Sequence, residues 1–308
     1  MGRHIVRSLA RRGYRIRVAC RRPDLAGHVQ PLGTTGQIMP VQANVRYPAS
    51  LAAACDGAFA VINLTGVLAG RGAQSFEAVH VFGAEACAKA ARAAKAPVFV
   101  QMSALGADLN SASEYARSKA TGEMRAKASF PGAIILRPSI VFGPGDSFFN
   151  KFAMMSRLAP ALPLIGGGHT RFTPVFVGDV AEAVARLVDN AEANGKTYEL
   201  AGPEVFTLRQ LMEFTLETIG RKRLLVPVPW TIAKLLGTVL GILPGAPLTA
   251  DQVELLKTDN VVSALAANEG RDLAGLGIKP SSMQGIVPSY LYRFRRAGQF
   301  TAPKGIPE

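Results

Sequence analysis

The chain contains 308 residues, of which 48% are hydrophobic and 19% charged, so its composition is typical of a globular protein and excludes a disordered one. The net charge is +13, but the basic residues are scattered and no basic tract interleaves with aromatics, which argues against a nucleic-acid role. The three cysteines and four histidines lack disulfide or metal spacing, and we expect neither a secretory signal nor a membrane-spanning segment.

The first half of the chain alternates between helical and strand patterns. A helix is predicted at 3–12, and Gly13 ends it. Strands rich in valine and isoleucine then alternate with helices, which is typical of crossover connections in a parallel sheet covered on both faces. The expected strands are 14–20, 38–45, 58–66, 97–103 and 133–143, and the expected helices are 50–55, 74–94 and 113–128. The predicted fold is therefore α/β, a Rossmann-type doubly wound parallel sheet.

The second half differs from the first, because proline and glycine residues interrupt it and its patterns are mainly helical beyond residue 228. A strand is expected to enter a helix capped by Asp179, and Thr207 is expected to cap a later helix. We predict two domains on this basis. Residues 1–165 form a dinucleotide-binding domain, to which 171–200 returns, and 166–308 form a smaller, mostly helical domain for substrate or partner docking.

The beginning of the chain departs from the expected fold. A Rossmann domain opens with an apolar strand and a glycine-rich turn, and the next helix holds the pyrophosphate at its N-terminus. Here Met1 and Gly2 lead directly into a helix, so Gly2 can be the last glycine of that turn. We expect the first strand and most of the glycine-rich loop to be missing, through truncation or a start assigned too late. Alternatively, Gly2 is an ordinary N-terminal residue of a fold that begins differently.

Two arginines follow the predicted strand 14–20. At this position a carboxylate selects NAD, whereas an arginine accommodates the 2′-phosphate of NADP. Arg21 comes first after the strand and Arg22 follows it, so the sequence favours NADP(H) over NAD(H). The alternative is that both belong to a solvated turn, Arg-Arg-Pro-Asp.

Residues at the ends of later strands are expected along the same cofactor. Asn44 and Val45 close the expected strand 38–45, the third of the fold when the missing first strand is counted, where this fold usually places an amide or carboxylate beside the adenine. Leu64, Thr65 and Gly66 close the next, where a small backbone turn can lie along the nucleotide.

Tyr115 and Lys119 form a Tyr-x-x-x-Lys pair at the start of the expected helix 113–128. Residues four apart share a helix face, so the ammonium can lower the phenol pKa and hold the nicotinamide ribose. The phenol can then exchange the proton that accompanies hydride transfer. Ser103 ends the preceding strand, where its hydroxyl could bind a substrate carbonyl. The sequence therefore predicts a Ser103, Tyr115 and Lys119 catalytic set.

This series, followed by Arg-Pro-Ser-Ile-Val-Phe-Gly-Pro-Gly-Asp at 137–146, resembles the extended short-chain dehydrogenase/reductase superfamily, of the NAD-dependent epimerase/dehydratase type. Three stretches, 137–153, 248–263 and 289–300, also resemble the complex I accessory subunit family known as alpha subcomplex subunit nine. The second and third are the more specific, because general epimerases lack them.

The resemblance implies a tightly held NADPH whose role is structural, beside a quinone-reducing module at a membrane surface. Pro138 and Ile140 join the cofactor-lining residues by the same resemblance. The lost phosphate loop is a departure that puts binding in doubt, whereas the intact Ser, Tyr and Lys set favours activity. Whether the chain is an enzyme stays open.

The C-terminal region offers two possible docking surfaces. Residues 229–245 are apolar except for Lys234, and could rest on a membrane face or a partner, or form a buried helix of the smaller domain. Aromatic and basic residues interleave at 290–300, which suits anionic lipids or an acidic protein.

Two functions follow as hypotheses. The first is an accessory or assembly subunit of NADH:ubiquinone oxidoreductase, bound to complex I subunits or the inner membrane surface. It would lie at the cytoplasmic side of a bacterial inner membrane or in the mitochondrial matrix. The second is a free-standing NADP-dependent reductase, epimerase or dehydratase with Tyr115 as acid/base, whose substrate the sequence does not name.

Overall fold

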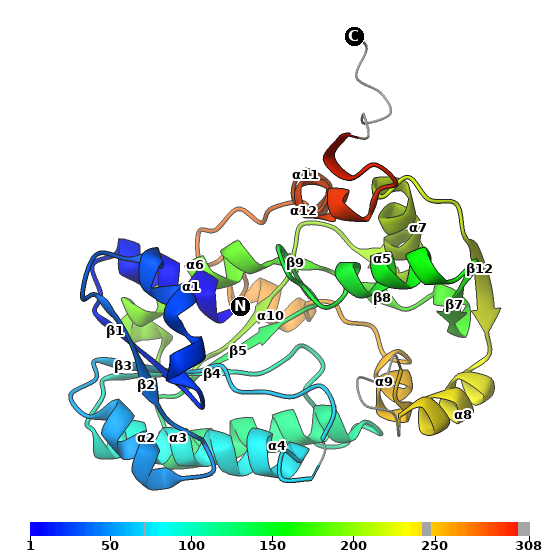
Figure 1. Cartoon of the computed structure of the whole chain (residues 1–308). Helices are drawn as coiled ribbons and strands as arrows, with labels where there is room; N and C mark the ends of the chain where they lie inside the picture. Colours follow the sequence, from blue (N-terminus) through cyan, green and yellow to red (C-terminus); the bar gives the residue numbers. More distant parts are fainter. Residues whose placement is uncertain (71, 242–247, 301–308) are drawn as a thin grey trace. The chain divides into compact units, whose positions relative to one another are not determined.

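The computed structural model describes residues 1–70, 72–241 and 248–300, which divide into two compact units (Figure 1). Unit 1 comprises Met1–Pro138, Val177–Leu200 and Val262–Lys279, and unit 2 comprises the other described residues. The first break between the units follows Pro138, whereas the expected domain boundary followed residue 165. The assignment of one domain to the cofactor and the other to docking stays a prediction.

Unit 1 contains two parallel sheets (Figure 1). One has four strands in the order β10-β5-β4-β3, and the other pairs β1 with β2. All pairings in both sheets are parallel. Their strands are β1 (Ile16–Cys20), β2 (Ile38–Gln42), β3 (Ala60–Asn63), β4 (Val98–Met102), β5 (Ile134–Pro138) and β10 (Thr197–Leu200).

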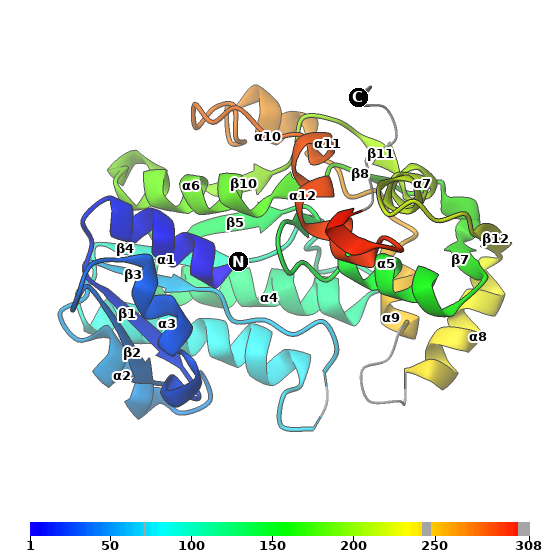
Figure 2. The same cartoon turned by 45° about the horizontal axis from the view of Figure 1, so that its top comes forward.

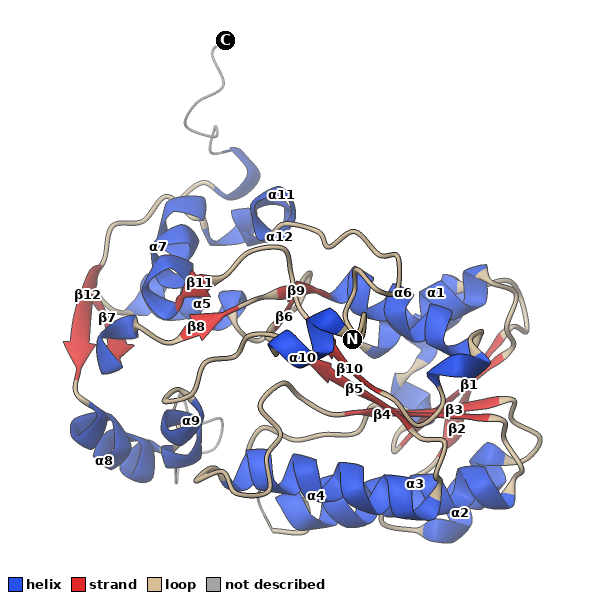
Figure 3. Cartoon of the chain, turned by 180° about the vertical axis from the view of Figure 1, so that it is seen from behind, coloured by secondary structure: helices blue, strands red, loops and turns tan. Residues whose placement is uncertain are grey.

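Helices cover both faces of the four-stranded sheet, as a parallel sheet requires (Figure 3). Helices α2, α3 and α4 lie on one face, and α1 and α6 lie side by side on the other (Figures 1 and 2). The helices of unit 1 are α1 (Gly2–Arg11), α2 (Pro48–Cys55), a π-helix at Glu77–Val81 that continues into α3 (Phe82–Ala93), α4 (Glu114–Ser129), α6 (Val177–Val188) and α10 (Ala264–Asn268), with short 3₁₀ turns at Pro23–Leu25, Gly27–Leu32 and Ala191–Ala193. The predicted Rossmann-type α/β class is confirmed.

Unit 2 is built around short strands and an aromatic core. Phe142, Phe149, Leu211 and Met212 are fully buried in that core. Strand pairs are β6 (Val141–Phe142) with β9 (Val175–Phe176), β7 (Ala161–Ile165) with β12 (Leu224–Val228), and β8 (Arg171–Phe172) with β11 (Phe206–Thr207). The helices are α5 (Phe149–Leu158), α7 (Leu208–Thr218), α8 (Trp230–Leu240), α9 (Ala250–Leu255), α11 (Met283–Ile286) and α12 (Pro288–Leu291), with 3₁₀ turns at Gly166–Gly168, Tyr292–Phe294 and Gly298–Phe300.

The two expected helix caps had different outcomes. Thr207 is confirmed, because its Oγ1 accepts the N–H of Gln210 at 3.2 Å and Gln210 Oε1 accepts the N–H of Thr207 at 2.7 Å. The cap expected at Asp179 is wrong. Helix α6 begins at Val177, directly after β9, so Asp179 lies within its first turn, where the helix dipole still favours a carboxylate.

Of the two alternatives for 229–245, the buried helix does not hold over the described part of that segment, which ends at Gly241. In α8 only Ala233 and Gly237 are buried, and Leu235 is 66% exposed. Ile232 and Val239 are also exposed, because α8 packs through its small residues. No helix in the described parts of the chain is long and apolar enough to cross a membrane.

The aromatic residues of the C-terminal stretch do not form one exposed surface. Tyr290 and Phe294 are buried in the core of unit 2, and the Tyr290 hydroxyl donates to Asp146. Tyr292 and Phe300 are exposed. Only part of this stretch is therefore available to a partner.

Candidate functional site

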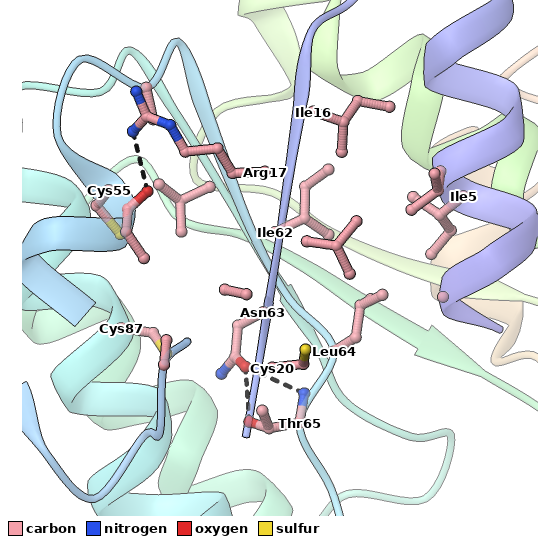
Figure 4. A pocket seen from close by; sticks show the side chains of 18 of the residues that line it. Ile5, Ile16, Arg17, Cys20, Cys55, Ile62, Asn63, Leu64, Thr65 and Cys87 are labelled. Carbon is pink, nitrogen blue, oxygen red and sulfur yellow. Dashed lines mark hydrogen bonds between the residues drawn. The ribbon is translucent and has the colours of Figure 1, made fainter. Parts of the chain in front are cut away.

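A cavity of about 1120 Å³ lies within unit 1, beside β1, β3 and the first helix (Figure 4). Its walls include loops that follow the carboxyl ends of parallel strands, where α/β folds hold their ligands. The predicted cofactor residues among its lining are Gly2, Arg21, Asn44, Val45, Leu64, Thr65 and Gly66. Arg22, Ser103, Tyr115, Lys119, Pro138 and Ile140 do not line it.

Asn63, which sequence reasoning missed, orders the loop after β3. Its Oδ1 accepts the Thr65 N–H at 3.1 Å and the Thr65 hydroxyl at 2.6 Å (Figure 4). Its Nδ2 donates to Gln101 Oε1 at 2.8 Å, which links the loop to β4. Because this amide is buried with its polar atoms bonded, it holds the Leu64–Thr65–Gly66 turn in place.

Helix α1 presents its N-terminus to the cavity. The positive end of its dipole favours an anion, and Gly2 and Arg3 at this end line the cavity. A Cβ built on Gly2 would lie 3.8 Å from Leu64 Cδ1, an ordinary contact. Space around Gly2 would therefore admit a Cβ, and the role of Gly2 at a cofactor stays a prediction.

Gly66 is more tightly surrounded than Gly2. A Cβ there would lie 3.2 Å from Lys119 Nζ and 3.6 Å from His80 Nε2. These two buried side chains pack against the loop, so a Cβ at 66 would require the lysine ammonium to shift slightly.

His80 is a buried, neutral member of this cluster. Its Nε2 accepts the Val67 N–H at 3.0 Å, so Nδ1 carries the proton and donates to Ser118 Oγ at 2.9 Å. Ser118 in turn donates to the Tyr115 carbonyl at 2.8 Å. Burial and the neighbouring Lys119 lower the pKa of His80 to about 3.

Lys119 and Tyr115 share a face of α4, as their spacing predicts. The Lys119 ammonium lies 5.9 Å from the centre of the Tyr115 ring and 3.5 Å from the Met102 carbonyl oxygen. Burial lowers the Lys119 pKa to about 8, and the negative charge of Glu123 opposes this shift. The lysine is therefore mainly protonated at neutral pH.

Ser103 is engaged with a carboxylate. Its hydroxyl donates to Glu123 Oε1, and Arg137 binds the same carboxylate through Nε at 2.9 Å and Nη2 at 2.7 Å. Ser103 and Glu123 are both buried. To bind a substrate carbonyl, Ser103 would first have to leave Glu123.

The remaining predicted residues lie in separate places. Arg21 is exposed beside the cavity, whereas Arg22 pairs with Asp24 at 2.7 Å in an exposed turn. Pro138 ends β5 in unit 1, and Ile140 belongs to unit 2. The roles of all these residues at a cofactor stay predictions.

The residues present fit a nicotinamide dinucleotide in part. Gly66 leaves room beside a buried lysine, and Arg21 stands free of the ion pair that engages Arg22. When bound, such a group supplies or accepts a hydride. The N-terminus of α1, whose residues Gly2 and Arg3 line the cavity, is suited to the phosphates of such a nucleotide.

Comparison with known proteins shows the family of the chain. Residues 1–201 match the NAD dependent epimerase/dehydratase family. The chain belongs to this family. Its expected resemblance to the subunit nine branch is also confirmed, because curated relatives of that name align with nearly the whole chain.

The relatives can be compared over most of their length. The alpha subcomplex subunit 9 of mitochondrial NADH dehydrogenase [ubiquinone] 1 is 34% identical in Arabidopsis thaliana, covering 97% of this chain and 76% of that protein. The Rattus norvegicus protein of the same name is 32% identical over 92% and 75%. An NADPH-dependent quinone oxidoreductase from Escherichia coli, solved with NADPH, has a TM-score of 0.70 at 22% identity over 94% and 96% of the two chains, and shares the fold.

Three structurally important residues escaped sequence reasoning. Glu123 follows Lys119 by four residues, so helical spacing could have placed them together. Asn63 carried a weaker signal, as a carboxamide at the end of an apolar strand. His80 carried none, because its partners Val67 and Ser118 are distant in the chain.

Proposed function

We propose that this chain is an NADP(H)-binding accessory subunit of a respiratory complex I, in which the nucleotide has a structural role. The proposal is supported by the near full-length similarity to alpha subcomplex subunit 9. The observation that carries it is the bond from Ser103 to Glu123, because a hydroxyl held by a buried carboxylate is not available to a substrate. A nucleotide that stays bound without turnover does not need that hydroxyl.

The preference for NADP(H) rests on Arg21. It is the first residue after β1, it lines the cavity and it is exposed to a ligand. A guanidinium can bind a 2′-phosphate through two hydrogen bonds, whereas NAD selection uses a carboxylate at this place.

Docking to other subunits would use unit 2. Helix α8 exposes Ile232, Leu235 and Val239, and such a face is suited to an apolar partner surface or the edge of a membrane. The net charge of +13 would favour anionic lipids or acidic subunits at the inner membrane. The named relatives are mitochondrial proteins, and a matrix or bacterial inner-membrane location for this chain stays a prediction.

Arg21→Asp tests the cofactor, with Arg22→Asp as the matched control. Loss of a charge-assisted contact costs about 1.5–3 kcal/mol, so the NADPH dissociation constant should rise roughly 10- to 100-fold in the first variant. The control should change little, because Arg22 already pairs with Asp24. Equal effects on NADPH and NADH in the first variant would contradict 2′-phosphate recognition.

Association with complex I is tested by tagging the full chain and purifying it under mild conditions from its source. Complex I subunits should co-purify, and deletion of the gene should reduce assembled complex I. If the chain is absent from the purified complex and deletion leaves assembly unchanged, the proposal fails.

A free-standing reductase is the second candidate, favoured by Tyr115 and Lys119 on one face of α4. In that case Tyr115→Phe should abolish turnover of any substrate found, because the phenol would supply the proton. Unchanged turnover would exclude this mechanism.

A further inference from the structure

A second cavity lies in unit 1, at the amino end of β10, and we call it the amino-end cavity. It has a volume of about 400 Å³ and is lined by Lys127, Gly195, Lys196, Thr197, Glu269 and Arg271. None of these residues lines the larger cavity. The strands of the four-stranded sheet are parallel, and the candidate cofactor residues Leu64, Thr65 and Gly66 follow the carboxyl end of β3. The amino-end cavity therefore lies away from them.

Three segments of the chain meet around the amino-end cavity. Lys127 comes from the last turn of α4, Gly195 from the turn that enters β10, and Arg271 from the segment that follows α10. The Glu199 N–H donates to the Arg271 carbonyl at 2.9 Å, so this last segment runs beside β10, the outermost described strand of the sheet (Figure 3). Gly195 has a φ of +79°, which favours glycine and turns the chain into β10.

Thr197, the first residue of β10, bonds two of the cations. Lys127 Nζ donates to its Oγ1 at 3.1 Å, and Arg271 Nη1 donates to its carbonyl at 2.6 Å. Because the hydroxyl oxygen accepts from the lysine, its own proton can be donated elsewhere, and no described residue accepts it. Thr197 is therefore a hydrogen-bond donor held between an ammonium and a guanidinium.

The cations of the amino-end cavity keep donors that the described protein groups do not use. Lys127 forms no ion pair with a carboxylate in the described parts of the chain, and its bond to Thr197 uses one of its three N–H groups. Arg271 Nε donates to Glu269, whereas Nη2 bonds none of the described residues. Lys196 is exposed beside them. An oxyanion could accept from all of these donors.

The charge of the lining is unbalanced. Three basic residues stand against one carboxylate, that of Glu269, which gives a net charge of +2. Burial lowers the pKa of Lys127, and the positive charges of Arg137 and Arg271 act in the same direction. Glu123 opposes this shift, but its carboxylate is already bound by Arg137 through two hydrogen bonds. A half-buried ammonium in such surroundings is stabilised by an added anion.

This set of donors suits a phosphate group. A guanidinium presents its N–H groups in a fork that matches phosphate oxygens, and an ammonium and a hydroxyl add further donors. A phosphate monoester carries a charge of about −1.5 to −2 at neutral pH, which complements the lining better than a single carboxylate does. The volume of about 400 Å³ is in the range of small-molecule sites and leaves room for an organic part.

We propose that the amino-end cavity binds the phosphate group of a small phosphorylated molecule through Lys127, Arg271 and the Thr197 hydroxyl, with Lys196 at its rim. The site is separate from the nucleotide cavity. The proposal does not depend on the nucleotide or on an association with complex I.

Calorimetric titration with inorganic phosphate at constant ionic strength tests the site, with and without NADPH. Phosphate should bind, and NADPH should leave its dissociation constant unchanged. Displacement of phosphate by NADPH would assign the anion to the larger cavity and overturn the proposal, as would chloride that binds equally well. A chain that binds phosphate but no NADPH would contradict the proposed function and support this site.

Two substitutions with opposite expected effects sharpen the test. Lys127→Met should raise the phosphate dissociation constant roughly tenfold, the effect of one lost charge-assisted bond. Glu269→Gln should lower it, because the lining becomes more positive. Lys89→Met is the matched control, since Lys89 pairs with Glu85 on α3 at 2.6 Å and should not affect binding. Unchanged affinity in Lys127→Met, or weaker binding in Glu269→Gln, would overturn the proposal.

Lysine acetylation of the unmodified chain, followed by mass spectrometry, tests the site without any substitution. Inorganic phosphate at ten times its dissociation constant occupies about nine-tenths of the sites, so it should slow acetylation of Lys127 about tenfold. Acetylation of Lys89 should not change. An unchanged rate at Lys127, or equal slowing at both lysines, would overturn the proposal.

Discussion

Neighbouring strands of one sheet, β4 and β3, have similar apolar sequences but differ in how deeply their side chains are buried. Val-Phe-Val-Gln-Met in β4 is buried throughout, whereas Ala-Val-Ile in β3 is half-buried. The difference arises because β4 pairs with β3 and β5, whereas among the described residues β3 pairs with β4 alone. The burial of an apolar strand thus depends on the strands beside it and not on its own residues alone.

The region of β4 and β5 also holds buried charged side chains. Glu123 is buried because Arg137 and Ser103 satisfy its oxygens, and Lys119 is buried beside it. Such groups tolerate loss of solvent only while they remain paired. Substitutions near β4 and β5 should therefore lower the free energy of unfolding more than substitutions on β1 and β3.

Truncation of a core side chain should give the largest difference between the two regions. Phe99→Ala in β4 should lower the free energy of unfolding by about 4 kcal/mol, because Phe99 is fully buried. Val61→Ala in β3 should lower the free energy of unfolding by less than about 1 kcal/mol, because the Val61 side chain is only half-buried. Urea denaturation of both variants measures this, and similar losses would contradict the contrast.

Titration of Lys119 should give the next largest effect. Its folded pKa of about 8 lies below the unfolded value of 10.5, so the unfolded chain binds more protons between these pH values and stability should rise with pH across that window. The rise should be at most about 3 kcal/mol and should be absent in Lys119→Met. Lys89→Met is the control, because Lys89 is exposed on α3, and an unchanged pH profile in Lys119→Met would refute the effect.

Removal of the Ser103 hydroxyl should have a smaller effect. Ser103→Ala deprives Glu123 of one donor and should cost about 2 kcal/mol in unfolding free energy, the value of a hydrogen bond to a charged group. NADPH affinity, measured by calorimetry, should stay unchanged if Ser103 only anchors Glu123. A large loss of affinity with unchanged stability would assign Ser103 to the nucleotide instead.

A polar substitution on β1 should have the smallest effect. Val18→Thr keeps the shape of a half-buried side chain and should change stability by less than about 1 kcal/mol. Urea denaturation of this variant and of the unmodified chain measures the change, and a loss of several kcal/mol would contradict the half-buried position of Val18.

Local patterns in the sequence were sufficient for the elements and for the contacts within them. Period-two and helical spacing placed the strands and helices of the first half, and with them the α/β class. The four-residue spacing of Tyr115 and Lys119 put both on one face of α4, and the Thr207 cap was readable because its partner is three residues away. Each of these features depends on residues that are close in the chain.

Only the tertiary structure decided which distant groups meet and which surfaces stay open. Ser103 donates a hydrogen bond to Glu123, which follows it by twenty residues, and His80 bonds both Val67 and Ser118. Long-range packing also decides the exposure of α8 and the placement of Ile140 in unit 2. It likewise decides the half-burial of the apolar side chains in β1 and β3. The physical reason is that side-chain burial and backbone pairing are properties of neighbours in space, which short-range periodicity does not encode.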